Sequence, residues 1–115
     1  MKTISEFILA KQKQEKISMV TCYDFTSAQI IKNTNVDAVL IGDSAAMTMH
    51  GYPNAVCAIM DQMVLHTSAV TKVIKTKLVI AYLPFLSYRS GFANTLLSVK
   101  RLMQAVLPHI NLVGW

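Results

Sequence analysis

A short apolar run, Ala38-Val39-Leu40-Ile41, ends abruptly in Gly42-Asp43-Ser44. A run of this length that contains β-branched residues and stops at a turn signal is typical of a strand buried on both faces. Parallel α/β sheets place their binding and catalytic groups at the carboxyl ends of such strands. We therefore interpret Gly42-Asp43-Ser44 as part of a functional site.

The composition of the chain is unusually apolar. Apolar residues make up 53% of the 115 residues and charged residues only 15%, whereas ordinary soluble domains carry about 25% charged residues. A chain of this length forms one small domain or part of a larger one. The excess of apolar surface has to be covered by a large interior, by partners or by further sequence.

Charge and cysteine content exclude several classes of function. The net charge is +5, but the lysines are scattered and no basic stripe carries interleaved aromatic residues, so we expect no nucleic-acid partner. No apolar run reaches the roughly 18 residues that a membrane span needs, and we expect no membrane partner. Cys22 and Cys57 lack the spacing of a zinc or redox site and are predicted to be small buried thiols. With no export signal at the N-terminus, a cytoplasmic location is expected.

Helical and strand-like patterns alternate along the chain, which is typical of a parallel α/β sheet or barrel. Helices are predicted over residues 3–12, 26–33, 60–74 and 92–106, and strands over 17–23, 36–41, 78–83 and 110–113. The order is an N-terminal helix followed by (βα)₃β. A (β/α)₈ TIM barrel takes about 250 residues. We therefore predict that residues 1–115 form the N-terminal half of such a barrel, as a partial domain whose C-terminal half is absent.

Three predicted strand ends bring polar residues toward one rim of this barrel. They are Tyr23-Asp24, Gly42-Asp43-Ser44 and Tyr82-Leu83-Pro84. A carboxylate in the position of Asp43 either caps the following backbone or contacts a cation or substrate, and the residues alone leave both roles open.

Two further polar residues have structural interpretations. Asp24 precedes a predicted helix, so it is expected to act as an N-cap. His66 lies within an apolar helix without a second ligand at helical spacing, so we expect a core histidine bonded to backbone. The four glycines form no phosphate-binding motif, which disfavours a nucleotide site.

A series of short motifs, in order along nearly the whole chain, resembles ketopantoate hydroxymethyltransferase (3-methyl-2-oxobutanoate hydroxymethyltransferase). The motifs are Thr21-Cys22-Tyr23-Asp24, Val39-Leu40-Ile41-Gly42-Asp43-Ser44, Met47-Thr48, Gly51-Tyr52, Leu65-His66-Thr67 and Leu83-Pro84-Phe85-Leu86-Ser87-Tyr88. The resemblance implies a (β/α)₈ barrel that assembles into large homo-oligomers. It also implies the transfer of a one-carbon unit from methylenetetrahydrofolate to 3-methyl-2-oxobutanoate, which gives ketopantoate for pantothenate and coenzyme A.

The resemblance also assigns roles at the strand end. In this family a magnesium ion binds the keto and carboxylate oxygens of the substrate and acts as a Lewis acid while a base removes the neighbouring proton. By resemblance, Asp43 is a magnesium ligand, and Asp43 with Ser44 contacts the keto acid.

Several positions depart from the family pattern. Tyr82 stands where the family has a second metal-binding aspartate, and a neutral phenol is a poor magnesium ligand. An ungapped alignment places Asn111 and Val113 opposite the family's substrate-binding lysine and metal-linked glutamate. Ala46 replaces a family glycine. The family's catalytic glutamate would lie beyond Trp115, so no catalytic residue is assigned within the chain.

These departures leave three hypotheses. The chain is an active hydroxymethyltransferase, or a non-catalytic remnant or structural subunit that associates with an intact homologue, or a small-molecule binding module that keeps Asp43 and Ser44. One metal ligand without a base cannot assemble the enolate chemistry. We therefore expect a truncated chain that is inactive by itself.

Overall fold

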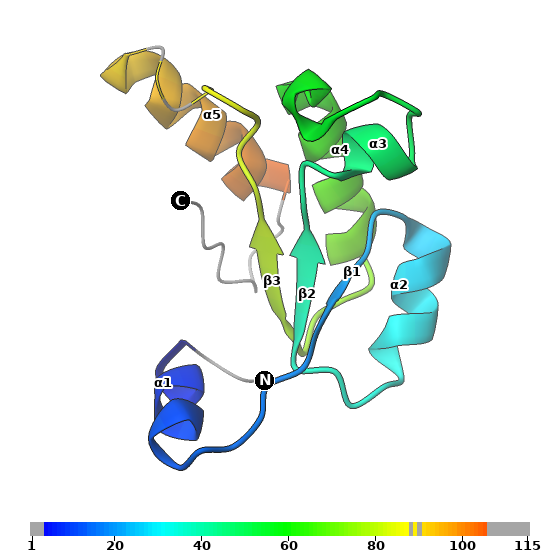
Figure 1. Cartoon of the computed structure of the whole chain (residues 1–115), viewed down its shortest axis with the longest axis vertical. Coiled ribbons are helices and arrows are strands. Elements are labelled where there is room, and N and C mark those ends of the chain that lie inside the picture. Colours follow the sequence, from blue (N-terminus) through cyan, green and yellow to red (C-terminus); the bar gives the residue numbers. More distant parts are fainter. Residues whose placement is uncertain (1–3, 88, 90, 106–115) are drawn as a thin grey trace.

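The computed structural model describes residues 4–87, 89 and 91–105, and these form an α/β structure with a parallel sheet (Figure 1). The helices are α1 (Ile4–Gln12), α2 (Phe25–Lys32), α3 (Ala45–Thr48), the 3₁₀ turn η1 (Ala55–Cys57), α4 (Met60–Thr71) and α5 (Phe92–Ala105). The strands are β1 (Met19–Thr21), β2 (Ala38–Ile41) and β3 (Leu78–Ala81). None of the described helices is long and apolar enough to cross a membrane.

The three strands lie side by side in the order β1-β2-β3, and both pairs are parallel. Figure 1 shows the three strands running in the same direction, with α1 at the end where they begin. Parallel neighbours require a crossover connection, which α2 provides between β1 and β2 and α4 provides between β2 and β3. This connectivity brings all three carboxyl ends to one edge of the sheet.

The hydrophobic core lies between the sheet and α4. Alternate residues of a strand point to opposite faces, and the paired residues Val39 and Val79 are completely buried. The next pair on the same face, Ile41 and Ala81, is also completely buried. Met63 of α4 is fully buried in the same cluster. A buried side chain of this size contributes roughly 1.5–3 kcal/mol relative to exposure, so this layer holds β2 and β3 in place.

The other face of the sheet is only partly covered. A hollow of about 270 Å³ on this face is lined by Phe7 of α1, by Ile17, and by Met19, Leu78 and Ile80 of the strands. Met19 remains 54% exposed. Part of the apolar surplus seen in the composition therefore lies on this open face.

Most of the predicted elements are confirmed, with shorter limits. The seven predicted helices and strands that lie before residue 106 are all present. The strands are shorter than predicted, since β1 and β3 stop at Thr21 and Ala81 rather than at residues 23 and 83. The segment between β2 and α4 also contains α3 and η1, which were not predicted. Gly51 and Pro53 in this segment are typical of a loop, so nothing in the sequence indicated these short helices. The predicted strand at 110–113 lies outside the described residues.

Asp24 begins α2 in the predicted way. Its extended backbone precedes the helix, and its side chain accepts a hydrogen bond from the Ser27 backbone N–H at 2.9 Å. This hydrogen bond lowers the pKa of the Asp24 carboxyl, because it stabilises the charged form. The N-cap prediction is confirmed.

We expect Asp24→Ala to lower the free energy of unfolding by about 1 kcal/mol at neutral pH, since it removes the cap. A carboxyl whose pKa is lowered by folding stabilises the protein above its ordinary pKa of about 3.9, and this contribution is lost as the pH falls through the lowered value. Urea unfolding of the chain and variant across this acid range measures the difference. Asp24→Asn should keep the cap without this pH dependence. Equal stability of the Ala variant and the unmodified chain at neutral pH contradicts the prediction.

Candidate functional site

The three predicted strand ends do meet at one edge of the sheet. Beyond β1, the Cys22 N–H donates to the Leu40 carbonyl at 3.0 Å. Beyond β3, the Tyr82 N–H donates to the Ile41 carbonyl at 3.0 Å. Both ladders therefore continue past the regular strands and place Tyr23 and Tyr82 on either side of the segment that follows Ile41. The predicted convergence is confirmed for the described residues.

Asp43 follows β2 by two residues and is half-buried at this edge. Its backbone carbonyl accepts a hydrogen bond from the Ala46 N–H at 3.1 Å. The N-cap of α3 is Ser44, whose side chain makes no capping bond. Among the described residues, the Asp43 carboxylate forms no hydrogen bond or ion pair. Capping therefore does not occupy this carboxylate, which is available to a ligand.

Ser44 is held by a side chain from the neighbouring strand end. Its Oγ lies 2.6 Å from the Tyr23 hydroxyl, and either oxygen can be the donor. Gly42 leaves room for this contact, because a Cβ at that position would come within 3.3 Å of the Ser44 Oγ. The Ser44 hydroxyl thus has a defined position beside Asp43, at the carboxyl end of β2.

His66 is a buried histidine that contacts the first strand end. Its side chain is 7% exposed, and Nδ1 lies 2.7 Å from the Tyr23 carbonyl oxygen. The prediction of a core histidine bonded to backbone is confirmed. Its Nε2 lies 2.8 Å from Nε2 of His50, which the sequence did not single out. The two histidines are 16 residues apart across an irregular loop, so no periodicity could have paired them.

The donor set at this edge matches only part of a magnesium site. Tyr82 is partly buried and packs against the core cluster. Across the part of the chain that the structure describes, no three His, Cys, Asp or Glu side chains gather to hold a metal. Magnesium binds oxygen ligands and is often held by one or two carboxylates together with substrate oxygens. Asp43 fits such an ion only if a substrate supplies further oxygens. The aligned positions Asn111 and Val113 lie outside the described residues.

The two cysteines differ in their surroundings. Cys22 is 2% exposed, and desolvation by burial raises the pKa of its thiol. Cys57 lies in η1 and is half-buried, with its Sγ 3.4 Å from the Asn54 Oδ1. The expectation of a buried thiol is correct for Cys22 and wrong for Cys57, because η1 lies in the irregular loop rather than in the core.

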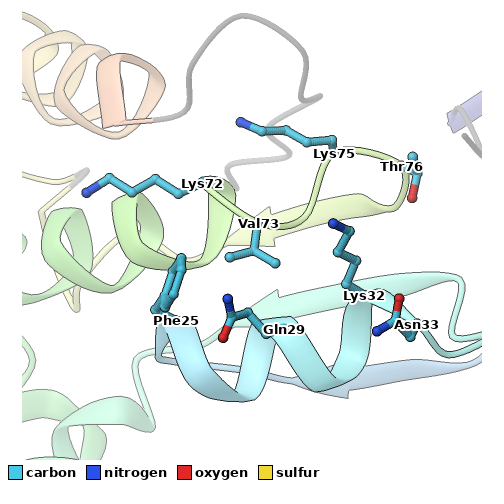
Figure 2. Close-up of a pocket in the computed structure, with 8 residues that line it drawn as sticks. All are labelled: Phe25, Gln29, Lys32, Asn33, Lys72, Val73, Lys75 and Thr76. Atoms are coloured by element: carbon cyan, nitrogen blue, oxygen red, sulfur yellow. The ribbon is translucent and has the colours of Figure 1, made fainter.

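A pocket of about 570 Å³ lies along α2, between this helix and the segment that follows α4 (Figure 2). It is lined by Lys32, Lys72 and Lys75 among others, where α2 and α4 end. Cations in this position complement the helix dipoles. Figure 2 shows the three ammonium groups spread along the pocket rather than converging on one point. The three lysines therefore do not form a single anion site in this pocket.

Comparison with known proteins assigns the chain to a family. The model of the ketopantoate hydroxymethyltransferase family matches residues 1–114. The chain belongs to this family. The resemblance inferred from the motifs is therefore confirmed, and the strand end that carries Asp43 and Ser44 lies well inside the matched region.

Curated relatives named 3-methyl-2-oxobutanoate hydroxymethyltransferase share 41–45% identity with the chain. The relative from Legionella pneumophila (strain Lens) is 45% identical over 111 residues, covering 96% of this chain and 42% of the relative. Those from Bdellovibrio bacteriovorus and Francisella tularensis subsp. tularensis are 41% and 43% identical over 114 residues, covering 99% of this chain and 43% of each relative. The chain thus spans less than half the length of these relatives.

Proposed function

We propose that Asp43 and Ser44 form the magnesium and keto-acid contact of a hydroxymethyltransferase site, and that these 115 residues do not complete the reaction by themselves. The observation that carries the proposal is the Asp43 carboxylate, half-buried at the carboxyl end of β2 and without a polar partner among the described residues. The resemblance to this family supports 3-methyl-2-oxobutanoate as the proposed substrate, with methylenetetrahydrofolate as the one-carbon donor.

The proposed fold of the complete site is a (β/α)₈ barrel, of which this sheet is the first part. Parallel strands alternating with helices are the repeating unit of that barrel. The chain covers 42–43% of the relatives' length, which agrees with this view, since about three to four of eight units account for such a share. The sites of such barrels lie at the carboxyl ends of the strands, which is where Asp43 and Ser44 stand.

The chain's own residues have separate tasks in this proposal. Asp43 would hold a magnesium ion through an anionic oxygen. Ser44 donates a hydrogen bond to a substrate oxygen, which it can do when the Tyr23 hydroxyl is the donor in their 2.6 Å contact. A magnesium ion bound here would polarise the keto oxygen and favour loss of the proton at C3.

The proposal that the chain is inactive alone rests on two missing groups. Tyr82 supplies a neutral phenol where a second carboxylate is expected from the family pattern. The second group is a base, since no described side chain at this edge has a geometry that assigns it that role. We therefore expect the chain to bind the keto acid without removing its proton.

A second candidate function is that of a non-catalytic subunit that associates with a polypeptide supplying further strands. The observation in its favour is the partly covered sheet face around Met19 and Ile80, together with β1 and β3 as the outer strands of the described sheet. Outer strands present unpaired backbone groups that other chains can bind. Co-purification of the tagged chain with an intact homologue expressed in the same cells tests this candidate.

The decisive experiment follows the C3 proton of 3-methyl-2-oxobutanoate in D₂O by NMR. We expect magnesium-dependent binding of the keto acid, seen as line broadening, with no exchange faster than in magnesium buffer without protein. An intact homologue serves as the positive control. Exchange of the C3 proton faster than in buffer overturns the proposal that the chain is inactive by itself. Absence of binding at millimolar keto acid overturns the assignment of Asp43 and Ser44.

A further inference from the structure

The hydrogen bond between His66 and Tyr23 decides which nitrogen of a neutral His66 carries the proton, and hence what His50 can offer it. A backbone carbonyl only accepts hydrogen bonds, so Nδ1 of His66, which lies 2.7 Å from the Tyr23 oxygen, carries a proton. In neutral His66 the other nitrogen, Nε2, is then an acceptor. His50 lies with its own Nε2 2.8 Å away, so His50 donates to His66. The exposed His50 imidazole thus provides the hydrogen bond that the buried His66 ring accepts at Nε2.

His66 in turn holds Tyr23 at two points. One is the backbone carbonyl, and the other is the aromatic ring, which meets the His66 ring edge-on with centroids 6.3 Å apart and planes at 71°. The far end of the same tyrosine carries the hydroxyl that lies 2.6 Å from the Ser44 Oγ. His50, His66, Tyr23 and Ser44 therefore form one continuous set of contacts from the loop after α3 to the candidate site.

This set of contacts is not a proton relay. The link between His66 and Tyr23 ends on a backbone carbonyl, which has no proton to pass on to the phenol at the other end of the residue. The contacts can instead fix the positions of the side chains, because each one restricts the rotation or displacement of the next.

We propose that His50 is a positioning residue for the Ser44 hydroxyl, acting through His66 and Tyr23. The inference rests on the proposed keto-acid contact of Ser44 and adds a residue that neither the family pattern nor the motifs singled out. Without the donor on His50, the nearly buried Nε2 of His66 loses its partner. The His66 ring can then turn to reach water, which loosens its hold on Tyr23.

The test compares two substitutions at an exposed position. His50→Leu removes the donor, whereas His50→Gln keeps an N–H that can reach His66. Met49→Leu is the matched control, because Met49 is the neighbouring residue, is 45% exposed and makes no contact in this set. The readouts are the NMR signals of the Tyr23 ring and the Ser44 Cβ, and the magnesium-dependent affinity for 3-methyl-2-oxobutanoate.

We expect His50→Leu to shift the Tyr23 and Ser44 signals and to weaken keto-acid binding by about 5-fold, in the range of coupling between contacting residues. His50→Gln should restore both readouts, and Met49→Leu should change neither. In a Tyr23→Phe background, where the bond to Ser44 is already lost, His50→Leu should weaken binding no further.

Two results overturn the proposal. One is a His50→Leu variant whose Tyr23 and Ser44 signals stay in place, and the other is an equal loss of affinity with and without the Tyr23 hydroxyl. The NMR signals of Tyr23 and Ser44 are measured on the chain without ligand. If the unmodified chain fails to bind the keto acid, the proposed function fails, while the signals of Tyr23 and Ser44 still decide whether His50 positions them.

Discussion

Asp43→Asn is expected to weaken magnesium-dependent binding of 3-methyl-2-oxobutanoate by about 10- to 100-fold, because one charged contact is worth roughly 1.5–3 kcal/mol. The amide keeps the shape of the side chain but removes the anionic oxygen that a magnesium ion requires. Since the carboxylate has no polar partner among the described residues, folding should be unaffected, with a free energy of unfolding within about 0.5 kcal/mol of the original. Calorimetric titration with and without magnesium measures the effect.

Asp61→Asn is the matched control for this prediction. Asp61 is another aspartate, but it lies on α4 in an exposed ion pair with Arg101, and such surface pairs contribute little to stability. The control variant should bind the keto acid as the original chain does. Equal binding by the Asp43 variant and the original chain contradicts the metal and substrate role of Asp43.

Tyr82→Asp is expected to raise the affinity for magnesium by about 10-fold, because it adds a second carboxylate beside Asp43, and ligand charge tunes the affinity of such ions. Ile41 pairs with Ala81, and the Tyr82 N–H bonds to the Ile41 carbonyl, so residue 82 lies beside Gly42, the residue directly before Asp43. Without magnesium the two negative charges repel each other, and we expect a lower melting temperature that added magnesium restores. Calorimetry of both states checks this expectation.

Tyr82→Asn separates charge from the loss of the aromatic ring. The asparagine variant loses the same packing against the core cluster, yet it should gain little magnesium affinity. Neither variant should convert 3-methyl-2-oxobutanoate and methylenetetrahydrofolate into ketopantoate, because no base is added. Appreciable turnover by Tyr82→Asp would show that the 115 residues already hold the remaining machinery, and the proposal of an inactive chain would be wrong.

Local patterns were sufficient for the parts of the structure that depend on neighbouring residues. Asp24 caps α2 through a bond to Ser27, three residues away, and such a bond can be inferred from residue order alone. The buried strand that ends before Gly42 is likewise a matter of composition and turn signals. Strand limits were less accurate, since β1 pairs over only three residues.

The contacts that organise the candidate site join distant segments. Tyr23 and Ser44 are 21 residues apart, and His66 reaches Tyr23 across 43 residues. Sequence spacing carries no signal for such pairs, because the strand order and the path of the loop after α3 decide which side chains meet. His50 had no motif of its own for the same reason.

The sequence by itself determined the alternation of helices and strands, the family, and the placement of Asp43 and Ser44 after a buried strand, because these follow from local hydrophobic periodicity and motif order. Only the tertiary structure decided that the Asp43 carboxylate is not used as a cap, and that Tyr23 and His66 hold the neighbouring Ser44. The physical reason is that hydrogen bonds between segments form only once the parallel sheet has brought the strand ends together.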